Sequence, residues 1–300
     1  MCKSSTVENV QSHPVFLLSS KACGASPPPV TSTVATAILF VGFLACMELS
    51  GRFCIDQMQS FSQVFEDETN RKILARHLFV DAFSCFMCFF LGWSNRAFTF
   101  RILKALSGDT KALPVASAES RALAYDNRSY FLCICFLSYQ LKNLYDTIAW
   151  NDGPEYIFHH VLSLCVCWMA LYPGYQLQYA EFYFGISELS TAVLCILANF
   201  DDEHGVVGLG DAFPLGKVVI GAVFAVLFAT FRCVIWPIVS YYYTRDALLC
   251  LKSEKKELKK RSLVIKIFVF CLTGLSALQI IWLGVIVFIA IDEFKAIGLL

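Results

Sequence analysis

Two adjacent histidines, His159 and His160, lie near the start of an apolar run over residues 156–171. A neutral imidazole near pH 7 serves either as a general base or as a nucleophile that attacks a carbonyl carbon. Ionisable side chains inside an apolar membrane segment are costly to bury, and they mark functional sites more often than such side chains do elsewhere. The histidine pair is therefore the first candidate for chemistry.

Helical spacing separates the two histidines. In a helix of 3.6 residues per turn, His160 is turned about 100° away from His159. His159 shares its face with Ser163, whereas His160 shares its face with the apolar Leu164. This pattern favours His159 as the reactive group and predicts a helix contact for His160, and both stay in the candidate catalytic set.

Polar stripes also occur in the neighbouring apolar runs. One face of the run before the histidines carries, at helical spacing, Tyr139, Lys142, Asn143 and Asp146. The run after them carries Glu188 and Thr191 on a shared side, and Arg232 lies well inside a later run. Arg232 has three open interpretations: an ion pair with Glu188, binding of an anionic head group, or a side chain that extends to the interface. The stripes either line a polar interior or serve only as contacts between helices.

The composition predicts an all-α, polytopic membrane bundle. Hydrophobic residues make up 57% of the 300, charged residues only 16%, and the mean hydropathy is +0.60, whereas a soluble domain has about 25% charged residues. A spanning helix needs about 20 apolar residues. We expect about seven spans, with six or eight as open alternatives, over residues 30–49, 77–93, 130–150, 156–171, 179–200, 215–243 and 264–291.

The charges between the runs predict a topology. Basic residues gather in the connections 94–129 and 244–263, whereas the connection after Phe200 is acidic. With seven spans the two basic connections lie on the same side, which the positive-inside rule makes cytoplasmic, together with the N-terminus. Basic residues beside spans favour anionic lipid head groups as partners over nucleic acid.

The chain ends and the cysteines add little chemistry. Residues 1–29 are Ser-rich and end in three prolines, so we expect a disordered tail, with a short C-terminal tail over residues 292–300. Most of the 14 cysteines lie inside apolar runs, where cysteine acts as a small hydrophobic residue. Cys85-x-x-Cys88 has no second pair of suitable spacing, and the chain has only five histidines. We therefore predict no metal site, which also disfavours a di-iron hydroxylase.

The order of these motifs resembles the TLC-domain family, which includes the ceramide synthases. The resemblance covers about residues 71–291 and rests on His159-His160, on the acid-bearing run before them, on Glu188-Leu189-Ser190-Thr191, and on Phe231-Arg232 followed by Pro237. It implies a six-helix core around a lipid-accessible cavity, with residues 30–49 as an extra first span. It also implies a location in the endoplasmic reticulum or another endomembrane. The family suggests a cytoplasmic C-terminus, against the charge rule, so both orientations stay open.

The resemblance implies a role in lipid metabolism or lipid homeostasis. In ceramide synthases the histidine pair belongs to the acyl-transfer centre, which corresponds here to His159 and His160. The chain lacks the acidic motif and the homeodomain-like segment of those enzymes, which brings it closer to the members that are not synthases. The expected catalytic residues are His159, His160, Asp146 and Glu188. The expected lipid-binding residues are Ser163, Thr191, Asn143, Arg232 and Tyr139.

Three functions stay open. The first is acyl transfer from acyl-CoA, as co-substrate and without another cofactor, to a lipid amine. The second is non-catalytic lipid binding or transport that regulates membrane composition. The third is a seven-span receptor, which we rank last because the Asp-Arg-Tyr and Asn-Pro-x-x-Tyr motifs are missing. The expected partners are membrane lipids, with a homodimer as a further open alternative.

Overall fold

The computed structural model describes residues 28–201 and 204–296, and these residues form helices and short connections without a strand. The helices are α1 (Val30–Asp56), α2 (Glu68–Ala75), α3 (Phe83–Ser94), α4 (Ala97–Leu106), α5 (Ala118–Leu123), α6 (Asn127–Trp150), α7 (Pro154–Leu171), α8 (Glu188–Leu197), α9 (Leu209–Ala212), α10 (Pro214–Phe228), α11 (Trp236–Leu251), α12 (Lys256–Lys260) and α13 (Ser262–Ala296). Three π-helical segments join them: η3 (Arg76–Ala82), η6 (Glu181–Ile186) and η8 (Ala229–Ile235). The predicted all-α class is confirmed.

Within the described residues, five continuous helical runs are long and apolar enough to cross a membrane. They are Val30–Asp56, Glu68–Ser94, Leu177–Phe200, Pro214–Leu251 and Ser262–Ile291. These five correspond to five of the predicted spans. The other two correspond to α6, which carries Lys142 and Asp146, and to α7, which carries the two histidines. The multi-pass membrane bundle is confirmed, while the exact count of seven spans stays a prediction.

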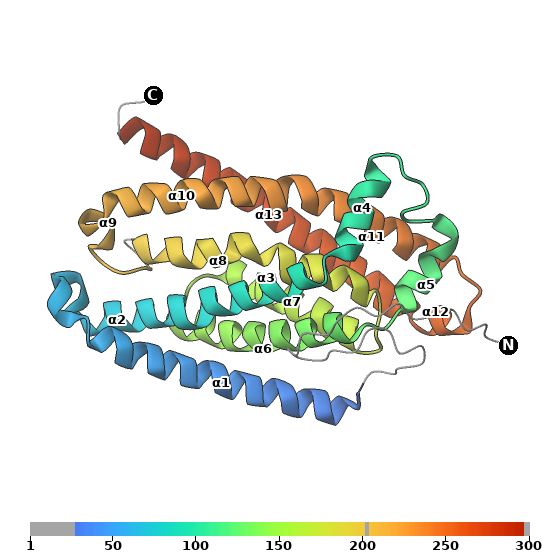
Figure 1. Ribbon diagram of the computed structural model, residues 1–300, viewed down its shortest axis with the longest axis horizontal. Helices are drawn as coiled ribbons and strands as arrows, with labels where there is room; N and C mark the ends of the chain where they lie inside the picture. The colour runs from blue at the N-terminus through green and yellow to red at the C-terminus, as the bar shows by residue number, and fades with distance from the viewer. Residues whose placement is uncertain (1–27, 202–203, 297–300) are drawn as a thin grey trace, which may run out of the picture.

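The long helices lie roughly side by side along the long axis of the molecule (Figure 1). α1 forms one edge, α10 and α11 form the opposite edge, and α3, α6, α7 and α8 lie between them. The short helices α4, α5 and α12 gather at one end of the bundle, and α9 lies at the other end. The two basic connections therefore lie at the same end, as the seven-span prediction requires.

The connection between α6 and α7 positions the histidines. α6 ends at Trp150 because Asn151 adopts a left-handed conformation with φ 58°. Gly153 then has φ 132°, which favours glycine, and Pro154 occupies the first position of α7, where its missing N–H costs nothing. Because this turn is so short, α7 runs back along α6, and His159 lies little more than one turn inside the new helix.

A pair of glycines brings α3 close to η6. A Cβ atom on Gly92 would lie 2.6 Å from the Cα of Gly185, and a Cβ on Gly185 would lie 2.6 Å from the Cα of Gly92. Neither position has room for a side chain, and small residues of this kind let helices in a membrane approach closely. This crossing fixes the segment that leads into α8 and therefore the position of Glu188.

Each of the three π-helical segments carries a buried charged side chain: Asp81 in η3, Glu181 in η6 and Arg232 in η8. A π-helical turn is rare and occurs often at functional sites. Glu181 stabilises the start of α4, because its carboxylate accepts a hydrogen bond from the Thr99 hydroxyl at 2.8 Å. Arg232 is the member of this set that lines the cavity described below.

Several helices extend beyond the predicted apolar runs. α1 continues to Asp56, the sixth predicted span becomes Pro214–Leu251, and α13 continues to Ala296. The first residues of the predicted C-terminal tail belong to α13, because helical hydrogen bonding continues past Ile291, where the predicted apolar run ends. Residues 1–27 of the predicted N-terminal tail, and residues 297–300, lie outside the described residues.

Candidate functional site

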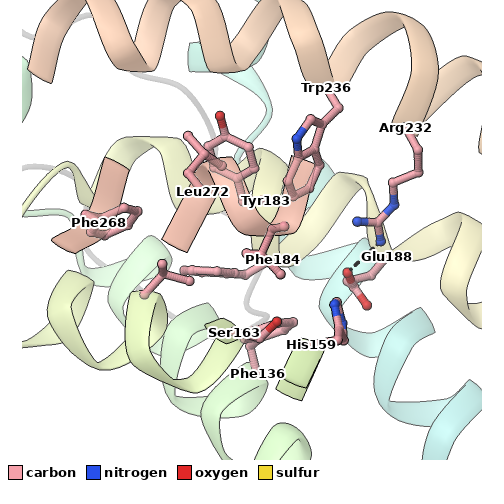
Figure 2. Close-up of a pocket in the computed structure, with 12 residues that line it drawn as sticks. Phe136, His159, Ser163, Tyr183, Phe184, Glu188, Arg232, Trp236, Phe268 and Leu272 are labelled. Atoms are coloured by element: carbon pink, nitrogen blue, oxygen red, sulfur yellow. Dashed lines mark hydrogen bonds and ion pairs between the residues drawn. The ribbon is translucent and has the colours of Figure 1, made fainter. Parts of the chain in front are cut away.

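The candidate site combines side chains from three separate helical segments. α7 contributes His159 and Ser163, α8 contributes Glu188, and η8 contributes Arg232. In Figure 2, His159 and the Glu188–Arg232 pair lie together at one end of the cavity, and Phe268 lies at the other. The segments are far apart in the sequence, so the tertiary fold alone brings these polar groups together.

Glu188 and Arg232 form a buried ion pair. The Nη2 atom of Arg232 lies 3.0 Å from Oε1 of Glu188 and donates a second hydrogen bond to the Thr191 hydroxyl at 2.8 Å. The Arg232 guanidinium also lies over the Trp236 ring, 5.2 Å from its centroid. Opposite charges that neutralise each other lower the cost of burying both inside a membrane bundle. Of the three predicted interpretations of Arg232, the pairing with Glu188 is therefore the one observed.

His159 lies beside this pair with unused hydrogen-bonding capacity. Its Nδ1 atom is buried and has no hydrogen-bonding partner among the described residues. Its ring packs edge-on against Trp282 of α13, with centroids 5.2 Å apart, and against His160 at 5.3 Å. His159 therefore faces the interior near Glu188, but neither oxygen of Glu188 is bonded to it. One oxygen accepts a hydrogen bond from Arg232 and the other from the Cys85 thiol.

The cavity at this site is narrow and mostly apolar. It has a volume of about 20 Å³, which is room for about one water molecule. Its walls are His159, Ser163, Glu188 and Arg232 at the polar end, and otherwise Phe136, Val166, Tyr183, Phe184, Trp236, Phe268, Leu272 and Leu275. The sequence predicts a lipid-sized interior, and the cavity is much smaller because large aromatic side chains fill the space between the helices.

A comparison with protein families decides the classification. A family model for the TLC domain matches residues 74–287. The chain belongs to the TLC-domain family. No curated protein and no solved structure matches it.

The TLC domain includes every residue that lines the cavity. The protein is thus an integral, multi-pass membrane protein of a family involved in lipid metabolism or sensing. The matched range agrees closely with the resemblance over residues 71–291. α1 precedes the TLC domain, as the extra first span predicted from the sequence does.

His160 makes a helix contact inside the TLC domain. Its Nδ1 atom lies 2.6 Å from Oε1 of Gln140 on α6. Because a carboxamide oxygen only accepts hydrogen bonds, the ring nitrogen donates. The side chain is buried and joins α6 to α7, which agrees with the helix contact predicted from its companion Leu164. The chemical roles of both histidines stay predictions.

The stripe on α6 lies apart from the cavity. Lys142 pairs with Asp146 on the same helix and with Glu48 of α1, whose Oε2 atom is 2.8 Å from the lysine Nζ. Asn143 donates a hydrogen bond to the Tyr139 hydroxyl at 2.8 Å. None of these four α6 residues lines the cavity, and Thr191 contacts it only through Arg232. Of the two alternatives for the stripes, the α6 residues therefore serve as contacts within and between helices, with Lys142 bound to Glu48 of α1, whereas residues of α7 and α8 line the cavity.

Two contributors to the site carry no signal in the sequence, whereas Glu48, which lies outside the site, did carry one. Trp236 and Trp282 lie in long apolar runs where every face looks alike, and the sequence does not show which face meets His159. Glu48 lies at the end of the first apolar run. A lone acid at that position was a signal for a buried partner, and its partner is Lys142.

Proposed function

We propose that the protein binds a membrane lipid at the His159 cavity and so acts in lipid handling. The observation that carries this proposal is the unpaired Nδ1 of His159, buried beside an ion pair at the polar end of an otherwise apolar cavity. A buried polar atom without a partner is unfavourable, so a ligand that supplies the missing hydrogen bond gains affinity. A lipid combines such a polar group with an apolar chain.

The charges favour an uncharged group at the polar end. Glu188 already neutralises Arg232, and the guanidinium also bonds Ser190 and Thr191. An anionic phosphate would have to displace the glutamate, whereas an ester, amide or hydroxyl group binds without breaking the pair. Because the cavity holds about one water molecule, entry of a chain requires side chains such as Trp236 to move.

Lipid retention by the purified protein tests this proposal. Wild-type protein, His159→Ala and Val161→Ala are purified in a mild detergent, and bound lipids are quantified by mass spectrometry. Val161 lies on the same helix with an exposed side chain, so it serves as the matched control. We expect one lipid class to be enriched in wild type and Val161→Ala and depleted in His159→Ala. Equal retention in all three proteins would contradict the proposal.

Acyl transfer is the second candidate, since the imidazole of His159 lies in the cavity with a free nitrogen. In this reaction the amine nitrogen of the lipid attacks the thioester carbon of acyl-CoA, and His159 takes the proton that the amine loses. The C–N bond forms, the C–S bond breaks, and the CoA thiolate takes the proton back. We rank it second because the two acids among the expected catalytic residues are engaged elsewhere: Glu188 pairs with Arg232 and Asp146 with Lys142.

A turnover assay separates the two candidates. Purified protein is incubated with a labelled fatty acyl-CoA and a sphingoid base or lysolipid, and the product is measured by chromatography. Product that disappears in His159→Ala but persists in Val161→Ala favours acyl transfer. Lipid retention without turnover favours binding alone.

We also propose an endomembrane location, with the endoplasmic reticulum as the first choice. The support is the family membership together with the multi-pass bundle. Fluorescence microscopy of the tagged full-length chain against organelle markers tests it, and a signal confined to the plasma membrane would contradict it.

A further inference from the structure

One face of α13 continues the wall of the His159 cavity. Leu272, Leu275, Gln279 and Trp282 are spaced three or four residues apart, so they form a line along the helix. The two leucines line the cavity, and the Trp282 ring contacts the ring of His159. Gln279 is buried and lies between these two points of contact on the same face of α13, a helix that packs against α7.

Gln279 is buried without any hydrogen-bonding partner. Its side chain is only 5% exposed, and both Nε2 and Oε1 lack a partner among the described residues. Buried carboxamides in folded proteins are almost always hydrogen-bonded. On the neighbouring helix α7, Nδ1 of His159 is likewise buried without a hydrogen-bonding partner among the described residues. Two packed helices thus present unsatisfied polar atoms at their shared face, which is the arrangement expected when a third molecule completes the hydrogen bonds.

The outer side of α13, next to this face, is exposed. Ile280 and Ile281, next to Gln279 on α13, are 73% and 60% exposed, and Val161 on α7 is exposed as well. Beyond Trp282 the packing of α13 is sparse, because a Cβ atom on Gly284 would meet nothing within 4 Å. In Figure 1, α13 crosses the other helices obliquely and its last turns project beyond the bundle. Beyond Trp282, α13 can therefore move away from α7 without breaking close contacts. At Trp282 itself, only its ring contacts with His159 and Tyr156 have to open.

We propose that a lipid acyl group enters from the bilayer between α7 and α13, with its carbonyl oxygen bound by Gln279 and with Trp282 displaced. A carboxamide has an NH₂ group that donates to a carbonyl oxygen and an oxygen that accepts from an N–H or hydroxyl. Both groups are uncharged, so the ligand is an ester or amide carbonyl at the head of an apolar chain. This inference rests on the proposed function and names the residue and the entrance through which it operates.

Photocrosslinking of the full-length protein in lipid nanodiscs tests the entrance. The probe is phosphatidylcholine with a diazirine in one acyl chain, and a ceramide with the same chain distinguishes an ester from an amide source. Labelled residues are mapped by mass spectrometry. We expect labelling of Leu275 and Trp282, the inner face of α13, in wild type. Gln279→Leu should lower this labelling about fivefold, the factor expected for the loss of one hydrogen bond, and Gln279→Asn should restore part of it.

Two measurements separate this role from a structural one. Ile280→Leu changes an exposed neighbour and should leave the inner-face labelling unchanged. Gln279→Leu should unfold at the same temperature as wild type or a higher one, because it removes an unpaired polar group from an apolar environment. A lower unfolding temperature would show that Gln279 serves the packing of the fold and would overturn the inference.

The outcomes also distinguish this inference from the proposed function. Wild-type protein that retains lipid on purification but is labelled only at Ile280 and Ile281 overturns the α7–α13 entrance and leaves the His159 cavity as the binding site. Wild-type protein that retains no lipid overturns the proposed function itself. Inner-face labelling that is equal in wild type and Gln279→Leu overturns the role of Gln279.

Discussion

Two of the buried arginine–carboxylate pairs in this bundle, Arg121–Asp246 and Arg232–Glu188, differ in how completely their hydrogen bonds are used. The first is the Asp246 network, which consists of Arg121, Tyr179 and Asp246. Arg121 binds both oxygens of Asp246, through Nε at 2.8 Å and Nη2 at 2.7 Å. The Tyr179 hydroxyl adds a third hydrogen bond at 3.0 Å. Asp246 is fully buried, and this network joins α5 to α11.

The second pair, Glu188 and Arg232, is less complete. Arg232 reaches one oxygen of Glu188, and the other oxygen meets only the Cys85 thiol at 3.6 Å, a weak donor. His159 beside the pair keeps an unpaired Nδ1, and a cavity adjoins it. The same type of ion pair, an arginine with a carboxylate, therefore serves two purposes in this protein. A saturated pair stabilises the fold, whereas an incompletely bonded pair leaves polar atoms available to a ligand.

The largest expected effect is the loss of Asp246. Asp246→Ala leaves the buried charge of Arg121 without its partner, and breaking a buried pair in this way costs about 3–5 kcal/mol. We expect the variant to unfold at a much lower temperature in detergent, or not to accumulate as folded protein. Arg245→Ala is the control. Arg245 is more exposed than Arg121, and its Nη2 atom lies 3.5 Å from Oδ1 of Asp246, so its loss removes only a weak contact to the same carboxylate. A variant as stable as wild type would refute the structural role of the network.

Removing both charges of each pair sharpens the comparison. The double variant Glu188→Gln/Arg232→Met should keep its stability within about 1–2 kcal/mol, since replacing a whole buried ion pair is often close to neutral. It should lose its bound lipid. Arg121→Met/Asp246→Asn should retain lipid, because that network lies away from the cavity lining. Lipid analysis and thermal unfolding of both double variants test this. Equal lipid retention in the two would contradict the functional difference between the pairs.

Replacing the two histidines should affect stability and lipid retention in opposite orders. His160→Ala breaks the bond to Gln140 and leaves that carboxamide buried, which costs about 1–3 kcal/mol. His159→Ala removes the aromatic contact with Trp282, which is worth about 0.5–1.5 kcal/mol. It breaks no hydrogen bond at Nδ1, because this atom has no partner among the described residues. We expect His160→Ala to lower the unfolding temperature more and His159→Ala to deplete lipid more. The reverse order would exchange the roles assigned to them.

The smallest expected effect is a pH dependence near the Asp246 network. Glu119, on the same helix as Arg121, bonds Lys255 at 2.8 Å and Ser253, and the hydrogen bond from Lys255 lowers the pKa of the carboxyl below its usual value. A lowered folded-state pKa stabilises the protein above the unfolded pKa of about 4.3, and this contribution is lost as the pH falls through the folded pKa. Unfolding temperatures at pH 6 and below pH 4 should therefore differ slightly less in Glu119→Gln than in wild type. Identical differences would show that the exposed contact contributes nothing.

The sequence by itself determined the membrane class, the positions of most long helices and the phase of the two histidines. Apolar runs specify helices because only helices satisfy the backbone inside a bilayer without external partners. A fixed 3.6-residue period then places His159 and His160 on different faces. The chemistry of buried charges made Glu188 a candidate partner of Arg232, since an unpaired charge at that depth is costly.

Only the tertiary structure decided which faces meet. An apolar helix such as α13 offers several equivalent faces, so its sequence does not reveal that Trp282 contacts His159 or that Gln279 is buried. The α6 stripe shows the same limit: Asp146 has the residue type and depth of a site residue, yet α6 turns Lys142 and Asp146 toward Glu48. Helical periodicity fixes rotation about one axis. The packing of neighbouring helices, including the close approach at Gly92 and Gly185, fixes the relative rotation of all of them and so selects the residues of the site.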